Sequence, residues 1–362
     1  MNIHEKYIKR CIELAKNGLG TTYPNPMVGS VIVLNDVIIG EGWHKKAGEP
    51  HAEVNAINSV EDKSLLKKAT IYVSLEPCSH YGNTPPCANL IIESGIKHVV
   101  MGVLDSNSKV CGRGMMHLQQ NGCDVTIGVL EKECSNLNKR FFTFHKKKRP
   151  FIVLKWAETN NGFIAPVYPE LVSGTNKKML KQVQHKSPIW ISNQYSQQLV
   201  HQWRSEEHAI LVGTNTVIAD NPKLNLRSWS GNNPIRIVMD RNLRIPNNAS
   251  VFDGSVKTIV LIEKREEGKE ESVNIVFEEI DFTKNIAKQI CDVLHKHQIQ
   301  SVIIEGGTQT LQTFIDENLW DEARVFIGEN EFEKGVKSPG IKGTLIEEIN
   351  IKKDVLKIYR ND

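Results

Sequence analysis

The chain has 362 residues, of which 40% are hydrophobic and 24% charged, and its formal net charge is +3. This length suits two domains, and the composition is that of an ordinary globular protein. The near-neutral charge argues against a nucleic-acid partner, and the lack of a signal peptide or an apolar run of roughly 20 residues argues against secretion or membrane insertion, so we expect a cytoplasmic protein.

The first part of the chain alternates between helical and strand patterns. Asn35-Asp36 separates two β-branched runs and predicts a hairpin turn. Apolar spacing predicts helices over 4–16, 52–57, 88–93 and 115–120, and strands over 28–34, 37–40, 70–75, 99–104 and 125–129. This order is typical of an α/β domain, a sheet covered by helices.

A basic run from His145 to Arg149, followed by Pro150, interrupts this pattern. We interpret it as a solvated linker rather than a nucleic-acid patch, and it predicts domains at 1–146 and 150–362. The second domain is predicted to have strands over 151–157, 187–192, 209–213, 234–240, 258–262, 301–305 and 323–328, helices over 194–207, 284–297 and 308–317, and a charged surface loop over 263–271.

One histidine and two cysteines form the clearest chemical pattern. Seven cysteines without a secretory signal indicate reduced thiols or metal ligands rather than disulfides. His51 opens a predicted helix, Cys78 follows a predicted strand and Cys87 begins the next helix, where a thiol pKa is lowered. An imidazole and two thiolates suit Zn²⁺ and leave a fourth position for water, as in catalytic zinc sites.

Glu53 follows the histidine by two positions, where it can take a proton from water and pass it to a departing amine. A His-x-Glu followed by two cysteines is typical of base deaminases, although the cysteine segment here is stretched from Pro77 to Cys87. The alternatives are buried cysteines beside a surface histidine, or a zinc-stabilised scaffold. A purely structural zinc site has no use for Glu53.

Residues 23–29, 47–53, 76–87, 111–114 and 118–122 resemble the bifunctional riboflavin-biosynthesis deaminase-reductase family. The resemblance implies a cytidine-deaminase-like three-layer α/β/α domain that hydrolyses the 2-amino group of a 2,5-diamino-6-ribosylamino-pyrimidinone 5′-phosphate. It implies zinc ligands His51, Cys78 and Cys87, a proton shuttle Glu53, and substrate contacts Asn25, His44, His80 and Asn107. Asn83 departs from a usually basic family position, and Ser106 from a usual proline.

The sequence motifs of the second domain indicate its function less clearly than those of the first. Glu305-Gly306-Gly307-Thr308 joins a predicted strand to a helix, which suits either a phosphate at the helix start or a plain tight turn. No Gly-x-Gly-x-x-Gly follows a predicted strand, so a Rossmann fingerprint is absent. Arg204 and Arg227 are either a phosphate clamp or surface residues.

Residues 155–157, 190–192, 203–205, 213–222, 234–240 and 305–308 resemble the reductase half of the same family. The resemblance implies a dihydrofolate-reductase-like α/β fold that uses NADPH to reduce the ribose to a ribityl chain. It implies substrate contacts Arg204, Leu224, Arg227 and Glu305, cofactor contacts Glu158, Trp190, Thr216, Asp220, Arg241, Gly307 and Thr308, and reactive polar groups Lys155, Asp220 and Glu305.

Two departures affect this half. Asn161 stands where the family usually has an aspartate, and residues 166–187 form a long insert that is either a surface loop or a lid. Two other functions stay open: a nucleic-acid base deaminase with a C-terminal recognition module, and a deaminase with a lapsed reductase half. The family also leads us to expect a homo-oligomer with a small-molecule substrate and no nucleic-acid or membrane partner.

Overall fold

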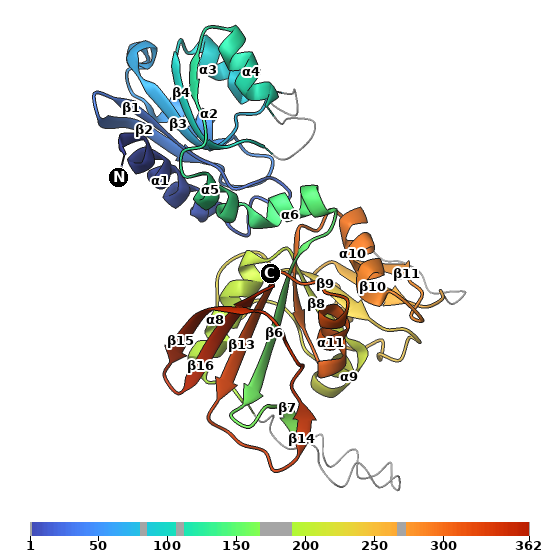
Figure 1. The fold of residues 1–362 in the computed structure, drawn as a ribbon. Helices are drawn as coiled ribbons and strands as arrows, with labels where there is room; N and C mark the ends of the chain where they lie inside the picture. The colour runs from blue at the N-terminus through green and yellow to red at the C-terminus, as the bar shows by residue number, and fades with distance from the viewer. Residues whose placement is uncertain (1, 80–84, 106–111, 167–189, 266–272, 362) are drawn as a thin grey trace, which may run out of the picture. The chain divides into compact units, whose positions relative to one another are not determined.

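The structure is a computed structural model that describes residues 2–79, 85–105, 112–166, 190–265 and 273–361. The chain divides into two compact units, unit 1 over residues 1–150 and unit 2 over residues 151–362 (Figure 1). In the described ranges, every helix is too short or too polar to reach across a bilayer.

Unit 1 contains one sheet of strand order β2-β1-β3-β4-β5, in which β1 is antiparallel to β2 and β3 while β3, β4 and β5 are parallel. Its elements are α1 (Ile3–Ala15), η1 (Lys16–Gly18), β1 (Gly29–Leu34), β2 (Val37–Trp43), α2 (Ala52–Ser59), η2 (Lys63–Lys68), β3 (Thr70–Leu75), α3 (Cys87–Glu93), β4 (His98–Val103), α4 (Arg113–Gln120), β5 (Asp124–Thr126), α5 (Glu131–Leu137) and α6 (Lys139–Lys147).

Alternate strand residues of unit 1 pack on opposite faces of the sheet. Ile71 and Met101 belong to one apolar cluster, together with residues of α2, α3 and α4. Tyr72 and Val100 belong to another cluster, together with residues of α1, α5 and α6. Both faces are therefore covered, and unit 1 is the expected three-layer α/β/α sandwich (Figure 1).

The predicted hairpin between β1 and β2 is confirmed. Asn35 and Asp36 have φ values of 49° and 62°, so both occupy the left-handed region that a tight two-residue turn requires. The turn folds β2 back onto β1, and β2 leads directly toward the Pro50-His51 segment.

Unit 2 contains a nine-stranded sheet of order β11-β10-β9-β8-β12-β6-β13-β16-β15, with β16 antiparallel to both of its neighbours and the other pairs parallel. Strands β14 and β7 form a separate pair. The elements are β6 (Phe151–Thr159), β7 (Phe163–Pro166), α8 (Gln194–Glu206), β8 (Ala209–Gly213), α9 (Thr214–Asp220), β9 (Ile235–Met239), η4 (Ser250–Phe252), β10 (Thr258–Ile262), β11 (Ile275–Glu279), α10 (Ile286–Lys296), β12 (Ser301–Glu305), α11 (Thr308–Asp316), β13 (Glu322–Gly328), β14 (Gly335–Lys337), β15 (Thr344–Ile351) and β16 (Asp354–Arg360).

Helices again cover both faces of this sheet. Leu154 and Ile304 pack with α10 and α11, whereas Val153 and Ile303 pack with Trp203 and its helix α8 (Figure 1). Strand β12 lies between β8 and β6, although it follows them by many residues in the chain. The carboxyl ends of these three parallel strands therefore meet where the chain order reverses, the usual place for a ligand in an open α/β sheet.

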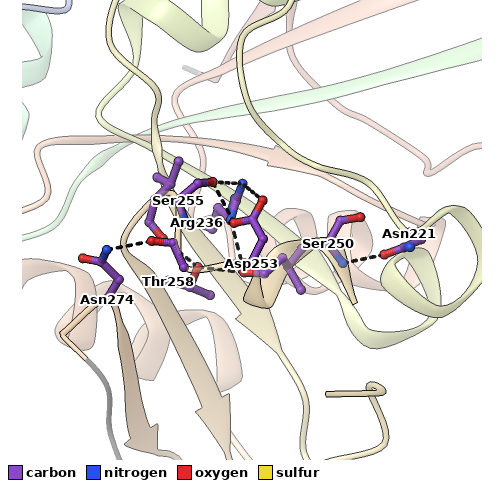
Figure 2. Close-up of polar contacts among 10 residues, drawn as sticks. Asn221, Arg236, Ser250, Asp253, Ser255, Thr258 and Asn274 are labelled. Carbon is purple, nitrogen blue, oxygen red and sulfur yellow. Dashed lines mark hydrogen bonds and ion pairs between the residues drawn. The ribbon is translucent and has the colours of Figure 1, made fainter. Parts of the chain in front are cut away.

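A polar network around a buried arginine joins the amino ends of β9, β10 and β11. Arg236 is fully buried, and its guanidinium donates to the Asp253 carboxylate at 2.7 Å and to the Ser255 hydroxyl at 3.3 Å (Figure 2). The Thr258 hydroxyl and the Asn274 amide bind backbone carbonyls of the same segment. These contacts fix the connection that returns from β9 to the start of β10.

Several sequence expectations need correction. Residues 190–192, the described part of the strand predicted over 187–192, form an irregular bend, because the Ile191 backbone packs closely against Gly328 and Asn193 then caps α8. The first part of the basic run is helical rather than a linker. Helix α6 continues to Lys147, because three of its phenylalanines are buried on its other side. Strand β5 is also shorter than predicted. Residues 167–187 of the insert lie outside the described residues.

Candidate functional site

The three predicted metal ligands come together in unit 1. His51 is the residue before α2, Cys78 follows β3, and Cys87 begins α3. The Nδ1 atom of His51 lies 3.3 Å from Cys87 Sγ and 3.7 Å from Cys78 Sγ, and the three ligand atoms lie within 4.8 Å of one another. Ligands at tetrahedral zinc distances would be about 3.5 Å apart, so the donor atoms and their spacing fit Zn²⁺.

The start of α3 favours the thiolate form of Cys78. A hydrogen bond from Cys87 lowers the pKa of Cys78, and the Cys87 backbone N–H also donates to Cys78 Sγ at 3.3 Å. One sulfur is thus held as a thiolate by the start of α3, as a metal ligand must be. The other described cysteines, Cys11, Cys123, Cys134 and Cys291, are buried away from this cluster, and Cys111 lies outside the described residues.

Glu53 lies beside the ligands without belonging to them. It is the second residue of α2, is only 3% exposed and interacts with the Cys87 thiol. Burial raises the pKa of Glu53 to about 7. A carboxyl group of that pKa can both accept and release a proton near neutral pH.

Two of the four predicted substrate contacts of unit 1 are next to the metal ligands. His44 is 2% exposed, and its ring centroid is 5.2 Å from that of His51. Its Nδ1 lies 3.2 Å from the Pro50 carbonyl oxygen, which can only accept, so Nδ1 carries the proton and Nε2 accepts from the Asn25 amide at 3.1 Å. Burial lowers the pKa of His44, consistent with this neutral form.

The other two predicted contacts, His80 and Asn107, lie outside the described residues, as do Asn83 and Ser106. Sequence reasoning gave no role to Asn55 and Glu76. The Asn55 amide donates to the Trp43 and Pro50 carbonyls at 2.8 and 3.2 Å and so ties β2 to the start of α2. Glu76 is buried and accepts several backbone N–H groups.

In unit 2 the structure brings together three of the residues predicted for the reductase site. Glu305 ends β12, and the Arg204 guanidinium from α8 grips both of its carboxylate oxygens, at 2.8 and 3.3 Å. The ammonium of Lys155 on β6, which is paired with Glu305 in the sheet, is 3.9 Å away. Burial alone would raise the pKa of Glu305, but Arg204 and Lys155 outweigh it and lower the pKa to about 2. Burial lowers the pKa of Lys155.

The glycine turn after β12 lies beside the end of β8. A side chain at Gly213 would touch Thr310 of α11, and Gly306 approaches the Gly213 backbone. Helices α9 and α11 both begin here, and among the described residues only the immediate chain neighbours come within 4 Å of where a Gly307 side chain would start. Thr216 is in the first turn of α9 and Thr308 opens α11, so the backbone N–H groups of two helix starts lie at the carboxyl ends of β8 and β12, where they fit a nucleotide phosphate.

Other predicted residues of unit 2 are engaged elsewhere or exposed. Glu158 accepts from the Trp156 indole at 2.8 Å, and Arg241 forms an exposed pair with Glu263 at 2.6 Å. Trp190, Asp220 and Arg227 are exposed, whereas Leu224 is buried with a φ of 53°.

Two buried polar groups near Arg204 and Glu305 were missed. His201 is 6% exposed and lies one helical turn before Arg204. Within the described part of the chain, its Nδ1 and the Asn225 Oδ1 have no hydrogen-bond partner. Burial lowers the pKa of His201 to about 4, with further contributions from Arg204 and Arg227. Only the (i, i+3) spacing to Arg204 signals His201 in the sequence.

Asn161, where the family usually has an aspartate, makes contacts that an aspartate could not reproduce. Its Oδ1 accepts from the Thr159 hydroxyl at 2.7 Å and from the Phe332 N–H at 3.3 Å, while its Nδ2 donates to the Phe332 carbonyl at 2.8 Å. Since a carboxylate lacks that donor, the amide suits this turn.

Comparisons with known protein families match both halves. Residues 1–103 match the cytidine and deoxycytidylate deaminase zinc-binding region, and residues 181–329 match the RibD C-terminal domain. The riboflavin biosynthesis protein RibD of Aquifex aeolicus is 38% identical over 96% of this chain and 92% of its own. That of Escherichia coli is 35% identical over 89% of this chain and 87% of its own.

Solved structures agree with these matches. A diaminohydroxyphosphoribosylaminopyrimidine deaminase/5-amino-6-(5-phosphoribosylamino)uracil reductase from Thermotoga maritima is 36% identical, with a TM-score of 0.84 over 99% of both chains. Acinetobacter baumannii RibD is 31% identical, with a TM-score of 0.86 over 99% of both chains. The predicted fold, a cytidine-deaminase-like α/β unit followed by an α/β reductase unit, is therefore confirmed.

Proposed function

Because the chain belongs to the RibD family of bifunctional riboflavin-biosynthesis deaminase-reductases, we propose that His51, Cys78 and Cys87 bind the zinc of its deaminase site and that Glu53 transfers protons there. The chain is a riboflavin-biosynthesis enzyme, a hydrolase and an oxidoreductase in one polypeptide. Its substrate is a diaminopyrimidine that carries a ribosyl 5′-phosphate, as in the name of the Thermotoga relative.

Glu53 moves the protons of deamination. Zinc, when bound, supplies Lewis-acid activation of water near neutral pH. Glu53 takes a proton from the attacking water as a C–O bond forms at the amino-bearing ring carbon, and then delivers a proton to the amino group as the C–N bond breaks and ammonia leaves. Its place beside the three ligands, buried from bulk water, suits a group that passes a proton between water and the amino group.

Asn25 and His44 orient the pyrimidine beside Glu53, with His80 and Asn107 as further contacts. The His44 ring is fixed as a neutral tautomer by the Pro50 carbonyl, so it directs the Asn25 amide by accepting one of its protons. The carbonyl oxygen of Asn25 is then presented as an acceptor for a ring N–H or amino group of the substrate.

The carboxyl ends of β8, β12 and β6 form the reductase site. NADPH, when bound, supplies a hydride to the opened ribose. Arg204, Leu224, Arg227 and Glu305 contact the substrate, and Glu158, Trp190, Thr216, Asp220, Arg241, Gly307 and Thr308 contact the cofactor. Lys155, Asp220 and Glu305 are the polar groups around the reduced carbon, and the Lys155 ammonium can deliver the proton that accompanies the hydride, because Glu305 is ionised.

We place the deaminase domain at residues 1–146 and the reductase domain at residues 150–362, within one to four residues of the boundary between the two compact units. We assign the enzyme to the cytoplasm and to a homo-oligomeric state.

The convergence of His51, Cys78 and Cys87 beside the buried Glu53 carries this proposal, and Glu53→Gln tests it. The variant should keep its zinc but release ammonia about 10³-fold more slowly, because the amide cannot accept the proton of water. Zinc content and ammonia release are measured on the wild type, on Glu53→Gln and on Glu61→Gln, an exposed control in the same unit. Near-normal turnover of Glu53→Gln would refute the assigned role.

A further inference from the structure

Glu76 is a buried carboxylate between β3 and the first metal-binding cysteine. It is 4% exposed and accepts four backbone N–H groups. Asp105 and Gly112 donate to Oε2 at 3.1 and 3.0 Å, and Gly114 and Met115 donate to Oε1 at 2.9 and 3.2 Å. A carboxylate has only acceptors, so four donors on two oxygens satisfy it without a cation.

These bonds join segments that are distant in the sequence. Asp105 lies two residues after the end of β4, whereas Gly112 and Gly114 belong to the start of α4. The first N–H groups of a helix have no partner inside it. No side chain at the Gly112 cap supplies one, and Glu76 takes that role from another element. The end of β3 is thereby attached to β4 and α4 together.

The attachment reaches the metal ligand through Pro77. A side chain at Gly114 would begin 2.0 Å from the Pro77 carbonyl oxygen, so α4 lies directly against the peptide that precedes Cys78. On the other side, the Ala88 N–H of α3 donates to the Cys78 carbonyl at 3.1 Å. The Pro77-Cys78 segment is therefore held between two helices, α4 through Glu76 and Gly114, and α3 through Ala88.

We propose that Glu76 is a positioning residue of the metal centre: by fastening the end of β3 to the start of α4, it fixes Cys78 at the distance from His51 and Cys87 that zinc binding needs. This inference rests on the proposed function of His51, Cys78 and Cys87. It assigns Glu76 no contact with substrate or metal.

Glu76→Gln is the sharpest substitution, because it keeps the shape of the side chain and changes one acceptor into a donor. The new –NH₂ group faces two backbone N–H donors, so one pair of bonds is lost and α4 moves relative to Pro77. Groups that orient metal ligands usually contribute about 10- to 100-fold to metal affinity. A comparable loss is expected here.

The test measures zinc affinity by competition with a chelator on the full-length chain, followed by ammonia release at saturating zinc. We expect Glu76→Gln to bind zinc about tenfold more weakly or worse. Its kcat/KM for ammonia release should fall, while NADPH oxidation by unit 2 is unchanged. Glu93→Gln, an exposed glutamate on α3, is the matched control and should behave as the wild type.

Gly114→Ala disturbs the same contact from the side of α4, because the added methyl group would collide with the Pro77 carbonyl. It should also lower zinc affinity. Wild-type zinc affinity in both variants would overturn the proposal. So would a loss of ammonia release that comes only with unfolding of unit 1, seen by circular dichroism, because Glu76 would then serve the fold alone. A wild-type chain that binds zinc but releases no ammonia would instead contradict the proposed function, and the zinc affinities would still test Glu76.

Discussion

Arg204 and Glu305 form a bidentate ion pair among the proposed reductase residues, and the arginine controls the ionisation of the carboxylate. The guanidinium holds both carboxylate oxygens of Glu305, with Lys155 3.9 Å from the same group. A planar fork of this kind cannot be replaced by a point charge. Glu305 therefore stays ionised and oriented as long as Arg204 is in place, and the two residues present one combined surface to the substrate.

Arg204→Gln should weaken the reductase without affecting the deaminase. We expect KM for the deaminated substrate to rise about tenfold, since a charge-assisted contact is lost, while ammonia release is unchanged. Both activities are measured on one preparation, with Arg360→Gln, an exposed arginine of unit 2, as the control. Equal losses in both activities would show that Arg204 does not belong to one site.

The same variant should change the pH dependence of reduction. Arg204 and Lys155 together lower the pKa of Glu305 to about 2, so removal of Arg204 raises this pKa toward the ordinary range. Glu305 then becomes protonated at a higher pH when the solution is acidified. The acid limb of the kcat/KM profile should accordingly begin at higher pH in Arg204→Gln than in the wild type. Coincident acid limbs would show that the reduction rate does not depend on the ionisation of Glu305.

The sequence predicted residues that lie in a local pattern and missed those defined by distant contacts. His51 and Glu53 are two positions apart on one helix start, so their chemistry is visible in the sequence. The partners of Glu76 lie 29 to 39 residues away, and no spacing rule joins them. His201 is recognised only because the fold places it beside Arg227 and Glu305.

At the scale of elements, the buried Arg236 on β9 fastens this strand, through Asp253, to the segment that precedes β10 (Figure 2). Asp253→Asn should lower the free energy of unfolding by about 2 kcal/mol, because Arg236 is fully buried and loses its countercharge. Asp292→Asn, which breaks the exposed pair with Lys288, should cost about 0.5 kcal/mol or less. Denaturant unfolding measures the free energy of unfolding of both variants. Equal losses would contradict the stabilising role of the Arg236–Asp253 pair.

This contribution also has a definite pH dependence. Hydrogen bonding to Arg236 holds the pKa of Asp253 well below its usual range in the folded state. The pair therefore stabilises the fold above the unfolded pKa, and the stabilisation is lost as the pH falls through the folded pKa. The difference between wild type and Asp253→Asn should be full at pH 7 and shrink at pH values below about 4.

Elements with a strong apolar period were predictable, and those defined by their neighbours were not. Strands β3, β8, β10 and β12 are buried apolar runs, and each was predicted within one residue of its limits. Strand β15 has no buried residue and exists because it pairs with β16, so its own sequence carries little signal. The basic run after Phe144 indicated a linker, but the phenylalanines on the other side of α6 extend the helix through it.

At the scale of the whole molecule, the two chemistries are divided between two separately cored units. The proposed zinc ligands and Glu53 all lie within residues 1–150, whereas Lys155, Arg204 and Glu305 lie within residues 151–362. Each unit also matches its own family model. Residues 181–329 match a reductase domain, so the C-terminal half is not the nucleic-acid recognition module of the alternative base-deaminase function.

This division predicts that removal of zinc stops one reaction and spares the other. Chelation should reduce ammonia release to background, because the Lewis acid is lost and unpaired thiols remain in its place. NADPH oxidation with the deaminated intermediate should continue at the wild-type rate, since no proposed reductase residue takes part in the metal cluster among the described residues. The two rates are followed on one sample before chelation, after it, and after zinc is restored. Ammonia release should return with the metal, and a reductase rate that fell and recovered in parallel would show that the two units do not work independently.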